Sequence, residues 1–191
     1  MPALPCAAPQ ASTMPPPATL IRPSTEADLP AMTAIYANAV LSGSASFEID
    51  APDAAEMGRR RADVAAKALP WLVAESDGAV LGYAYASPFR PRLAYRYTLE
   101  DSIYVHEAAR GRGIGRLLLA ELIARSEAAG ARQMIAAIGD SANRASIALH
   151  EAAGFARVGT YRDVGRKFER WLDVVLMQRM LGPGGALPPA A

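Results

Sequence analysis

The sequence predicts one α+β domain, with helices on both faces of a mixed and mostly antiparallel sheet. Segments of strand and helix character alternate between Leu20 and Met180, and together they carry enough apolar residues for one core. Turn residues also join neighbouring strands: Asp77-Gly78 separates two apolar segments, which is typical of a hairpin. A chain of 191 residues is long enough for one such domain.

The first half of the domain contains a short strand, two helices and the hairpin. Thr25, with Asp28 three residues later, indicates a capped helix start, and apolar residues continue this helix to about Val40. A loop over 42–52 ends at Pro52. The expected elements are a strand at 20–22, helices at 25–40 and 53–69, and hairpin strands at 71–75 and 79–87.

The second half begins after a polar loop with two prolines at 88–96. Gly130 and Gly154 each follow a helical segment and indicate its end. The expected elements are strands at 97–105, 133–139, 156–165 and 171–180, and helices at 114–129 and 143–153.

Composition and charge exclude several classes of function. Twenty basic and 19 acidic residues leave a net charge of +1, so no general field attracts nucleic acid or a membrane surface. No apolar segment approaches the ~20 residues of a membrane span, and the first ten residues lack the basic start of a signal peptide. Cys6 is the one cysteine, and with two histidines it offers no metal cluster. We expect a cytoplasmic protein without a metal.

Both ends of the chain are poor in residues that build a core. Residues 1–19 are mainly Pro, Ala, Ser and Thr, and residues 182–191 read GPGGALPPAA. We expect disordered extensions at 1–19 and 182–191 around a domain at 20–181. The sequence leaves open whether Met1 or Met14 is the start.

The densest functional signal is a glycine-rich turn, HEAARGRGIGR, between a strand and a helix. Its glycines permit a tight turn whose N–H groups converge at the helix start, and its arginines add positive charge, which predicts a pyrophosphate site. The turn lacks the Gly-Lys-Ser/Thr of a Walker loop and the third glycine of the Rossmann fingerprint. A structural turn with solvated arginines is the alternative.

Two motifs resemble those of the GNAT acetyltransferase superfamily. Arg110-Gly111-Arg112-Gly113-Ile114-Gly115 resembles its Gln/Arg-x-x-Gly-x-Gly/Ala loop, and Asn143-x-x-Ser146-x-x-x-His150-x-x-x-Gly154-Phe155 resembles its Asn-x-x-Ala-x-x-x-Tyr-x-x-x-Gly-Phe helix. The resemblance implies the GNAT fold, in which a strand splays from its parallel neighbour and binds acetyl-CoA. The implied cofactor-binding residues are Ile103, Tyr104, Val105, Arg110, Gly111, Arg112, Gly113, Ile114, Gly115, Arg116 and Asn143.

The segment from Arg22 to about Met180 is similar to the phosphinothricin and methionine sulfoximine acetyltransferases. The tract 97–100 (YTLE) resembles their Tyr/Trp-Thr-Val-Glu, and 167–173 (KFERWLD) resembles their Lys-Phe-Gly-Arg-Trp-Leu-Asp. The resemblance also implies a homodimer with Phe168 and Trp171 at its interface. Departures at Phe47, Arg92 and Glu169 leave the acceptor open.

A carboxylate on the strand before the glycine turn is the candidate catalytic base. Acetyl transfer requires a neutral amine, and a carboxylate with a raised pKa can accept the ammonium proton. Along an alternating strand, Glu100 shares a face with Ser102 and Tyr104 and so faces a polar cleft. His150 is the candidate for protonating the departing thiolate or for holding a water near it. The alternatives are a surface glutamate and a structural histidine.

The acceptor site is expected around the loop before this strand. Arg90 and Arg92 suit a carboxylate through paired hydrogen bonds, unless they are solvated loop residues. The residues expected to line the site are Phe47, Phe89, Arg90, Arg92, Tyr97, Glu100, Asp101 and Ser102. The resemblance implies an N-acetyltransferase for a small amino acid-like amine. A protein or peptide N-acetyltransferase and a non-catalytic acetyl-CoA-binding relative are the alternatives.

Overall fold

A computed structural model describes residues 18–188 of the protein. The expected extension at 1–19 lies almost wholly outside the described residues, as do the last three residues of the expected tail. Residues 182–188 continue from the last strand as turns, where the Gly184 N–H donates to the Leu181 carbonyl at 2.9 Å.

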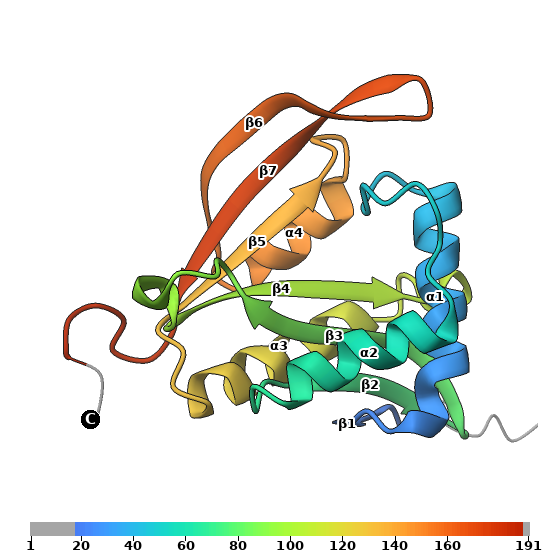
Figure 1. The fold of residues 1–191 in the computed structure, drawn as a ribbon, viewed down its shortest axis with the longest axis horizontal. Helices are drawn as coiled ribbons and strands as arrows, with labels where there is room; N and C mark the ends of the chain where they lie inside the picture. Colours follow the sequence, from blue (N-terminus) through green and yellow to red (C-terminus); the bar gives the residue numbers. More distant parts are fainter. Residues whose placement is uncertain (1–17, 189–191) are drawn as a thin grey trace, which may run out of the picture.

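Strands and helices alternate along the described chain in the predicted order (Figure 1). The strands are β1 (Leu20–Pro23), β2 (Trp71–Ser76), β3 (Ala79–Pro88), β4 (Thr98–Val105), β5 (Gln133–Gly139), β6 (Ala156–Lys167) and β7 (Arg170–Met180). The α-helices are α1 (Leu29–Ser42), α2 (Ala54–Ala65), α3 (Ile114–Ala128) and α4 (Arg144–Ala152). Short 3-10 turns precede α1 (η1, Glu26–Asp28), β4 (η2, Leu93–Tyr95) and α3 (η3, Glu107–Ala109).

The described strands form one seven-stranded sheet in the order β1-β2-β3-β4-β5-β7-β6. All neighbouring pairs are antiparallel except β4 and β5, which confirms the predicted mixed sheet. The parallel pairing runs only from Thr98↔Gln133 to Glu100↔Ile135, although both strands continue for several residues. The two strands therefore separate beyond Glu100, and their facing backbone edges lack a strand partner there.

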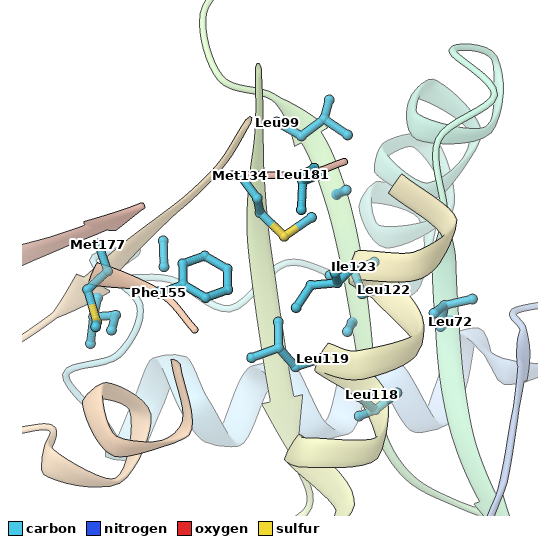
Figure 2. Packing of buried hydrophobic residues seen from close by; sticks show 14 of the residues in the cluster. Leu72, Leu99, Leu118, Leu119, Leu122, Ile123, Met134, Phe155, Met177 and Leu181 are labelled. Carbon is cyan, nitrogen blue, oxygen red and sulfur yellow. The ribbon is translucent and has the colours of Figure 1, made fainter. Parts of the chain in front are cut away.

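Helices cover both faces of the sheet (Figure 1). On one face, α3 contributes Leu118, Leu119 and Leu122 to a cluster that includes Leu99 and Met134 from the two splayed strands (Figure 2). The opposite face carries a second cluster with α1 and α2, and its aromatic members from the strands are Trp71, Tyr83, Tyr85 and Tyr104. Because alternate residues of β4 serve different clusters, the strand is the boundary between two separate layers.

Local sequence signals explain where several elements begin and end. Asp77 and Gly78 both have positive φ, at 50° and 74°, as a tight hairpin turn requires. The helix α2 ends at Ala65, earlier than the predicted residue 69, because the chain turns and Ala68 takes a left-handed φ of 54°. Gly130 and Gly154 also have positive φ, which confirms them as helix ends.

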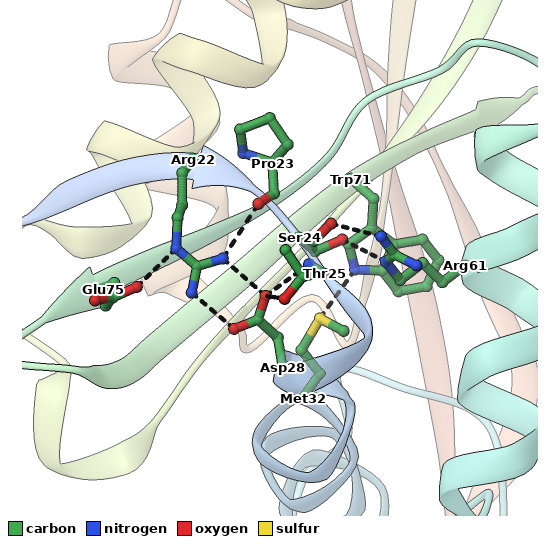
Figure 3. A network of polar contacts seen from close by, with 9 residues as sticks. All are labelled: Arg22, Pro23, Ser24, Thr25, Asp28, Met32, Arg61, Trp71 and Glu75. Atoms are coloured by element: carbon green, nitrogen blue, oxygen red, sulfur yellow. Dashed lines mark hydrogen bonds and ion pairs between the residues drawn. The ribbon is translucent and has the colours of Figure 1, made fainter.

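A polar network ties β1 to the start of α1 and to β2 (Figure 3). Asp28 accepts the Thr25 N–H at 2.7 Å, which confirms the predicted cap. The Arg22 guanidinium pairs with Asp28 at 2.8 Å and with Glu75 at 2.6 Å. The Arg22 guanidinium lowers the pKa of the buried Asp28 carboxyl to about 2, so this carboxylate stabilises the fold at neutral pH.

β6 and β7 form a long antiparallel arm that projects beyond the neighbouring strands (Figure 1). The arm exposes several large apolar side chains: Val158, Tyr161, Val164, Phe168 and Trp171. At its tip, Phe168 and Glu169 have φ of 50° and 57°. Glycine suits this left-handed region better than either residue, so the turn at the tip is strained.

Candidate active site

The separation of β4 and β5 opens a cavity of about 60 Å³ at the middle of the sheet. β4 lines one side of this cavity and β5 the other, while α4 covers one end. The lining residues are Ala45, Asp101, Ser102, Ile103, Tyr104, Ala136, Ala137, Ile138, Gly139, Asn143, Ser146 and His150. An extended polar chain can hydrogen-bond such unpaired strand edges much as another strand would.

The glycine turn joins the end of β4 to α3. Gly111 and Gly113 have φ of 76° and 80°, a conformation that suits glycine, and a Cβ at either position would meet nothing within 4 Å. Within residues 18–188, no carbonyl accepts the backbone N–H groups of residues 111–115. These groups lie at the positive end of the α3 dipole, beside the exposed side chains of Arg110, Arg112 and Arg116. The arrangement fits a pyrophosphate group.

α4 brings its polar residues to the cavity. The Asn143 side chain caps the helix, because its Oδ1 accepts the Ser146 N–H at 3.2 Å. Asn143, Ser146 and His150 line the cavity, whereas Ile147 packs against the apolar core. Asn143, Ser146 and His150 therefore lie together at the cavity.

His150 is buried and both of its ring nitrogens have partners. Nε2 lies 3.0 Å from Asp101 Oδ2, and Nδ1 lies 2.7 Å from the carbonyl oxygen of Ser146. The edge of the ring packs against Phe155, with centroids 5.0 Å apart. Burial alone would lower the pKa of His150, but the hydrogen bond and charge of Asp101 outweigh it and the pKa lies above its usual value.

Glu100 lies at the point where the two strands separate, paired in register with Ile135. Burial raises the pKa of the Glu100 carboxyl, the neighbouring Asp101 carboxylate raises it further, and Arg90 opposes both. A half-buried carboxylate with a raised pKa suits proton abstraction. Because residues alternate along β4, Glu100 faces the side of α1 and α2, and Asp101 faces the side of α3 and α4.

The loop before β4 forms a second hollow of about 470 Å³, lined by Phe89, Arg90, Pro91, Arg92 and Tyr95. The Arg90 guanidinium stacks over the Phe89 ring at 5.0 Å, and both arginines are exposed. Neither of them pairs with a carboxylate among residues 18–188. Tyr97 is half-buried, and the Arg96 guanidinium carbon lies over its ring, 4.4 Å from the ring centroid.

The structure does not bring all of the predicted acceptor residues together. Phe47 lies at the other end of β5 from Phe89, because it packs against Gly139 and Gly165. Asp101 is also separate, since it points away from Glu100 and is buried against His150. Glu100, Phe89 and Arg90 remain as one group at the start of β4.

The loop at 43–48 is held against the cavity from β6. The Lys167 ammonium is buried and donates to the carbonyls of Gly43 and Ser46, at 3.0 and 2.7 Å. A Cβ at Gly139 would lie 2.6 Å from the Ser44 carbonyl oxygen, so the loop rests directly on the end of β5. No local signal in the sequence links Lys167 to a loop more than 120 residues before it.

α1 and α2 hold the same loop from the other side. The Tyr36 hydroxyl lies 3.0 Å from Ser46 Oγ and donates to Glu48 Oε1 at 3.0 Å. Arg60 pairs with Glu48 at 2.7 Å and with Glu56 at 2.8 Å. The loop therefore has polar partners on three elements that are distant in sequence.

A metal site and a membrane-spanning helix each require a particular arrangement of residues. No group of three or more His, Cys, Asp or Glu side chains within 18–188 is arranged to hold a metal ion. In that same part of the chain, no helix has the length and apolar character that crossing a membrane requires.

The fold and this cleft define an acetyltransferase of the GNAT class. Residues 34–155 match the family described as "Acetyltransferase (GNAT) family", and the chain belongs to it. It is 54% identical to the phosphinothricin N-acetyltransferase of Alcaligenes faecalis, over 90% of this chain and 87% of that protein. It is 42% identical to the L-methionine sulfoximine/L-methionine sulfone acetyltransferase of Pseudomonas aeruginosa, over 88% of this chain and 98% of that protein.

A solved structure shows the same fold. The phosphinothricin acetyltransferase of Sinorhizobium meliloti, in complex with acetyl-CoA, superposes with a TM-score of 0.88 at 48% sequence identity. The superposition covers 90% of this chain and 93% of that one. The GNAT fold predicted from the sequence motifs is therefore confirmed.

Proposed function

We propose that this protein transfers the acetyl group of acetyl-CoA to the amine of a small amino acid of the phosphinothricin or methionine sulfoximine type. The observation that carries the proposal is Glu100, a half-buried carboxylate where β4 and β5 separate, with Arg90 as a nearby positive charge. The names of the related enzymes support the same class of acceptor.

Acetyl-CoA, as co-substrate, supplies an activated acetyl thioester. The N–H groups of residues 111–115 and the arginines beside them suit its pyrophosphate, and the open edges of β4 at 103–105 and of β5 suit its amide-rich arm. An N–H group of the separated β4 strand can also polarise the thioester carbonyl. We assign the glycine turn and the open edges of β4 and β5 to the cofactor, as one side of the cleft.

Glu100 takes the proton that the acceptor must lose. At neutral pH an amino acid carries an ammonium group, which has no lone pair for attack. The Glu100 carboxylate accepts a proton from this group, directly or through water. The freed nitrogen then bonds to the carbonyl carbon while the carbon–sulfur bond breaks, and the electron pair leaves with the thiolate. The nitrogen, which still carries two protons after the attack, gives one of them to water.

Arg90 and Arg92 suit the carboxylate of the acceptor. Both guanidinium groups are exposed at one hollow beside Glu100, and a guanidinium can bind a carboxylate through two parallel hydrogen bonds. A charge-assisted contact of this kind is worth roughly 1.5–3 kcal/mol. We therefore assign this loop to recognition of a free α-carboxylate.

The test is a thiol-release assay with phosphinothricin, methionine sulfoximine, their carboxyl amides and a peptide amine. We expect kcat/KM to fall about ten- to a hundredfold for the amides and for Arg90→Ala with the free acids, since ~1.4 kcal/mol is one decade. Arg90→Ala should leave the acetyl-CoA KM unchanged, and Arg59→Ala, an exposed arginine on α2, is the control. Equal rates for free and amidated acceptors would favour a peptide N-acetyltransferase.

We further propose that the protein works as a cytoplasmic homodimer. The apolar side chains exposed along the β6–β7 arm, including Phe168 and Trp171, support a second copy as the partner. Sedimentation of the wild type and of Trp171→Ser tests this, and a monomeric wild type would contradict it.

A further inference from the structure

The pair formed by Asp101 and His150 is a feature that the sequence did not predict. Asp101 is buried on β4, and His150 is buried on α4. Their contact joins two elements 49 residues apart across the cavity. Glu100 plays no part in this contact, because it lies on the opposite face of β4.

The partners of the two ring nitrogens determine the charge of His150. The Ser146 carbonyl oxygen can only accept a hydrogen bond, so Nδ1 at 2.7 Å carries a proton. When Asp101 is ionised its oxygens also only accept, and Nε2 at 3.0 Å from Asp101 then carries a second proton. A ring with both protons is an imidazolium cation, and Asp101 is its counter-ion.

No other charged side chain competes with Asp101 for this ring in the described part of the chain. β5 contributes the apolar residues Ala136 and Ile138 to the same cavity. α4 contributes the neutral residues Asn143 and Ser146, and Phe155 packs against the ring edge. Glu100, although adjacent in sequence, points to the other face. Among the described residues, Asp101 is therefore the one charged partner of His150.

We infer that Asp101 is a positioning residue that fixes the orientation of His150 and holds it as an imidazolium beside the leaving thiolate. This inference rests on the proposed acetyl transfer. In the reaction, the carbon–sulfur bond breaks and the sulfur keeps the electron pair. The cation stabilises that negative charge and keeps both of its protons, so the thiolate takes its proton from water afterwards.

A further observation agrees with a place in the active site. Asp101 lines the cavity, and its second oxygen, Oδ1, is buried without a hydrogen-bond partner among the described residues. A carboxylate with a purely structural role usually has both oxygens satisfied. Within residues 18–188, Asp101 Oδ1 therefore lacks the second partner that a structural carboxylate usually has.

The protein contains only two histidines, which makes a direct measurement simple. In protein labelled with ¹⁵N-histidine, the ring-nitrogen shifts report the protonation state of each histidine. His106 is exposed and its Nδ1 accepts the Ala108 N–H, so it provides a reference in the same molecule. We expect the pKa of His150 to lie above that of a free imidazole, so that the ring stays an imidazolium at a pH where a free imidazole is largely neutral.

The variant Asp101→Asn keeps the shape of the side chain and removes the charge. We expect the His150 pKa to fall in this variant, so that the ring is neutral at about pH 7.5 and kcat drops at least roughly tenfold. The His150 ring is charged only at a pH below its pKa. In Asp101→Asn, the pH above which kcat declines should therefore be lower than in the wild type. Lowering the pH should restore part of the activity of this variant. The acetyl-CoA KM should hardly change.

Asp101→Glu serves as the conservative variant and should recover part of the charge on His150. A His150 pKa in the wild type that is no higher than that of a free imidazole would overturn the inference, even if no variant folds. Unchanged His150 shifts in Asp101→Asn would overturn it as well. The ¹⁵N-histidine measurement needs no acceptor, so a failure of this inference can be distinguished from a failure of the proposed acceptor class.

Discussion

The two sides of the cleft are built in different ways. The side assigned to acetyl-CoA consists mainly of backbone groups, from the segment that runs from the end of β4 through the glycine turn to α3 and from the facing edge of β5. The side assigned to the acceptor consists of side chains from the loop at 89–92 and from β4. Ala45 of the loop at 43–48 also lines the cavity, and the position of this loop depends on distant contacts from α1, α2 and β6.

This difference determines what a mutation can change. A backbone site is lost when the chain can no longer adopt its conformation, whichever side chain is present. A side-chain site is lost when a single contact, even a remote one, lets an element shift. Variants of the two sides should therefore separate the KM for acetyl-CoA from the kcat/KM for the acceptor.

Glu100→Gln should give the largest effect, because it removes the base between the two sides. We expect kcat to fall roughly 10²–10⁴-fold with little change in the acetyl-CoA KM. In the wild type, kcat/KM should decrease as the pH falls through the raised Glu100 pKa, because a protonated carboxyl cannot accept a proton. Steady-state kinetics across pH check both points, with Glu121→Gln on α3 as the control. Near-normal turnover would show that the amine loses its proton elsewhere.

Gly113→Val should act on the cofactor side alone. A β-branched residue at φ 80° is strained by roughly 1–3 kcal/mol, which should raise the acetyl-CoA KM about five- to a hundredfold. The matched control is Gly159→Val, because Gly159 lacks a positive φ and has open space around it. Once acetyl-CoA saturates the variant, acceptor discrimination should be unchanged. An unaltered acetyl-CoA KM would remove the pyrophosphate assignment.

Lys167→Met should act on the cavity from a distance, through the loop at 43–48, and give the smallest effect. The loop at 43–48 would lose the buried ammonium that binds two of its carbonyls, and we expect up to about a tenfold loss in acceptor kcat/KM. The control is Lys67→Met, an exposed lysine that also donates to one carbonyl, that of Asp63. If Lys167→Met leaves the acceptor kcat/KM unchanged, the loop at 43–48 has no part in acceptor binding.

The same contrast explains how much the sequence could predict. The strand order along the chain and the glycine turn depend on neighbours within a few residues, and the sequence predicted them. Phe47 was grouped with Phe89 because nothing local shows that they lie at opposite ends of β5. The Lys167 contacts depend on where β6 meets the loop, which no local pattern encodes.

Asp101 was a different kind of error, because a local signal did exist. The alternation of side chains along β4 already assigns it to the opposite face from Glu100. Its partner His150 was recognised on α4, but the sequence could not show that the two elements meet. The alternation of side chains along a strand predicts the face of the sheet on which a residue lies. Its contacts with residues of other elements are known only from the packed structure.

The short parallel contact between β4 and β5 has a thermodynamic consequence. Beyond Glu100 the sheet is divided, so the protein without ligand lacks hydrogen bonds that an uninterrupted sheet would have there. A molecule that fills this gap links the two halves of the sheet and binds only the folded chain. At a hundred times its Kd, such a ligand stabilises the fold by about 2.7 kcal/mol. Acetyl-CoA would thus be a structural component of the sheet as well as a reactant, and backbone amides of both strands should exchange hydrogen more slowly in its presence.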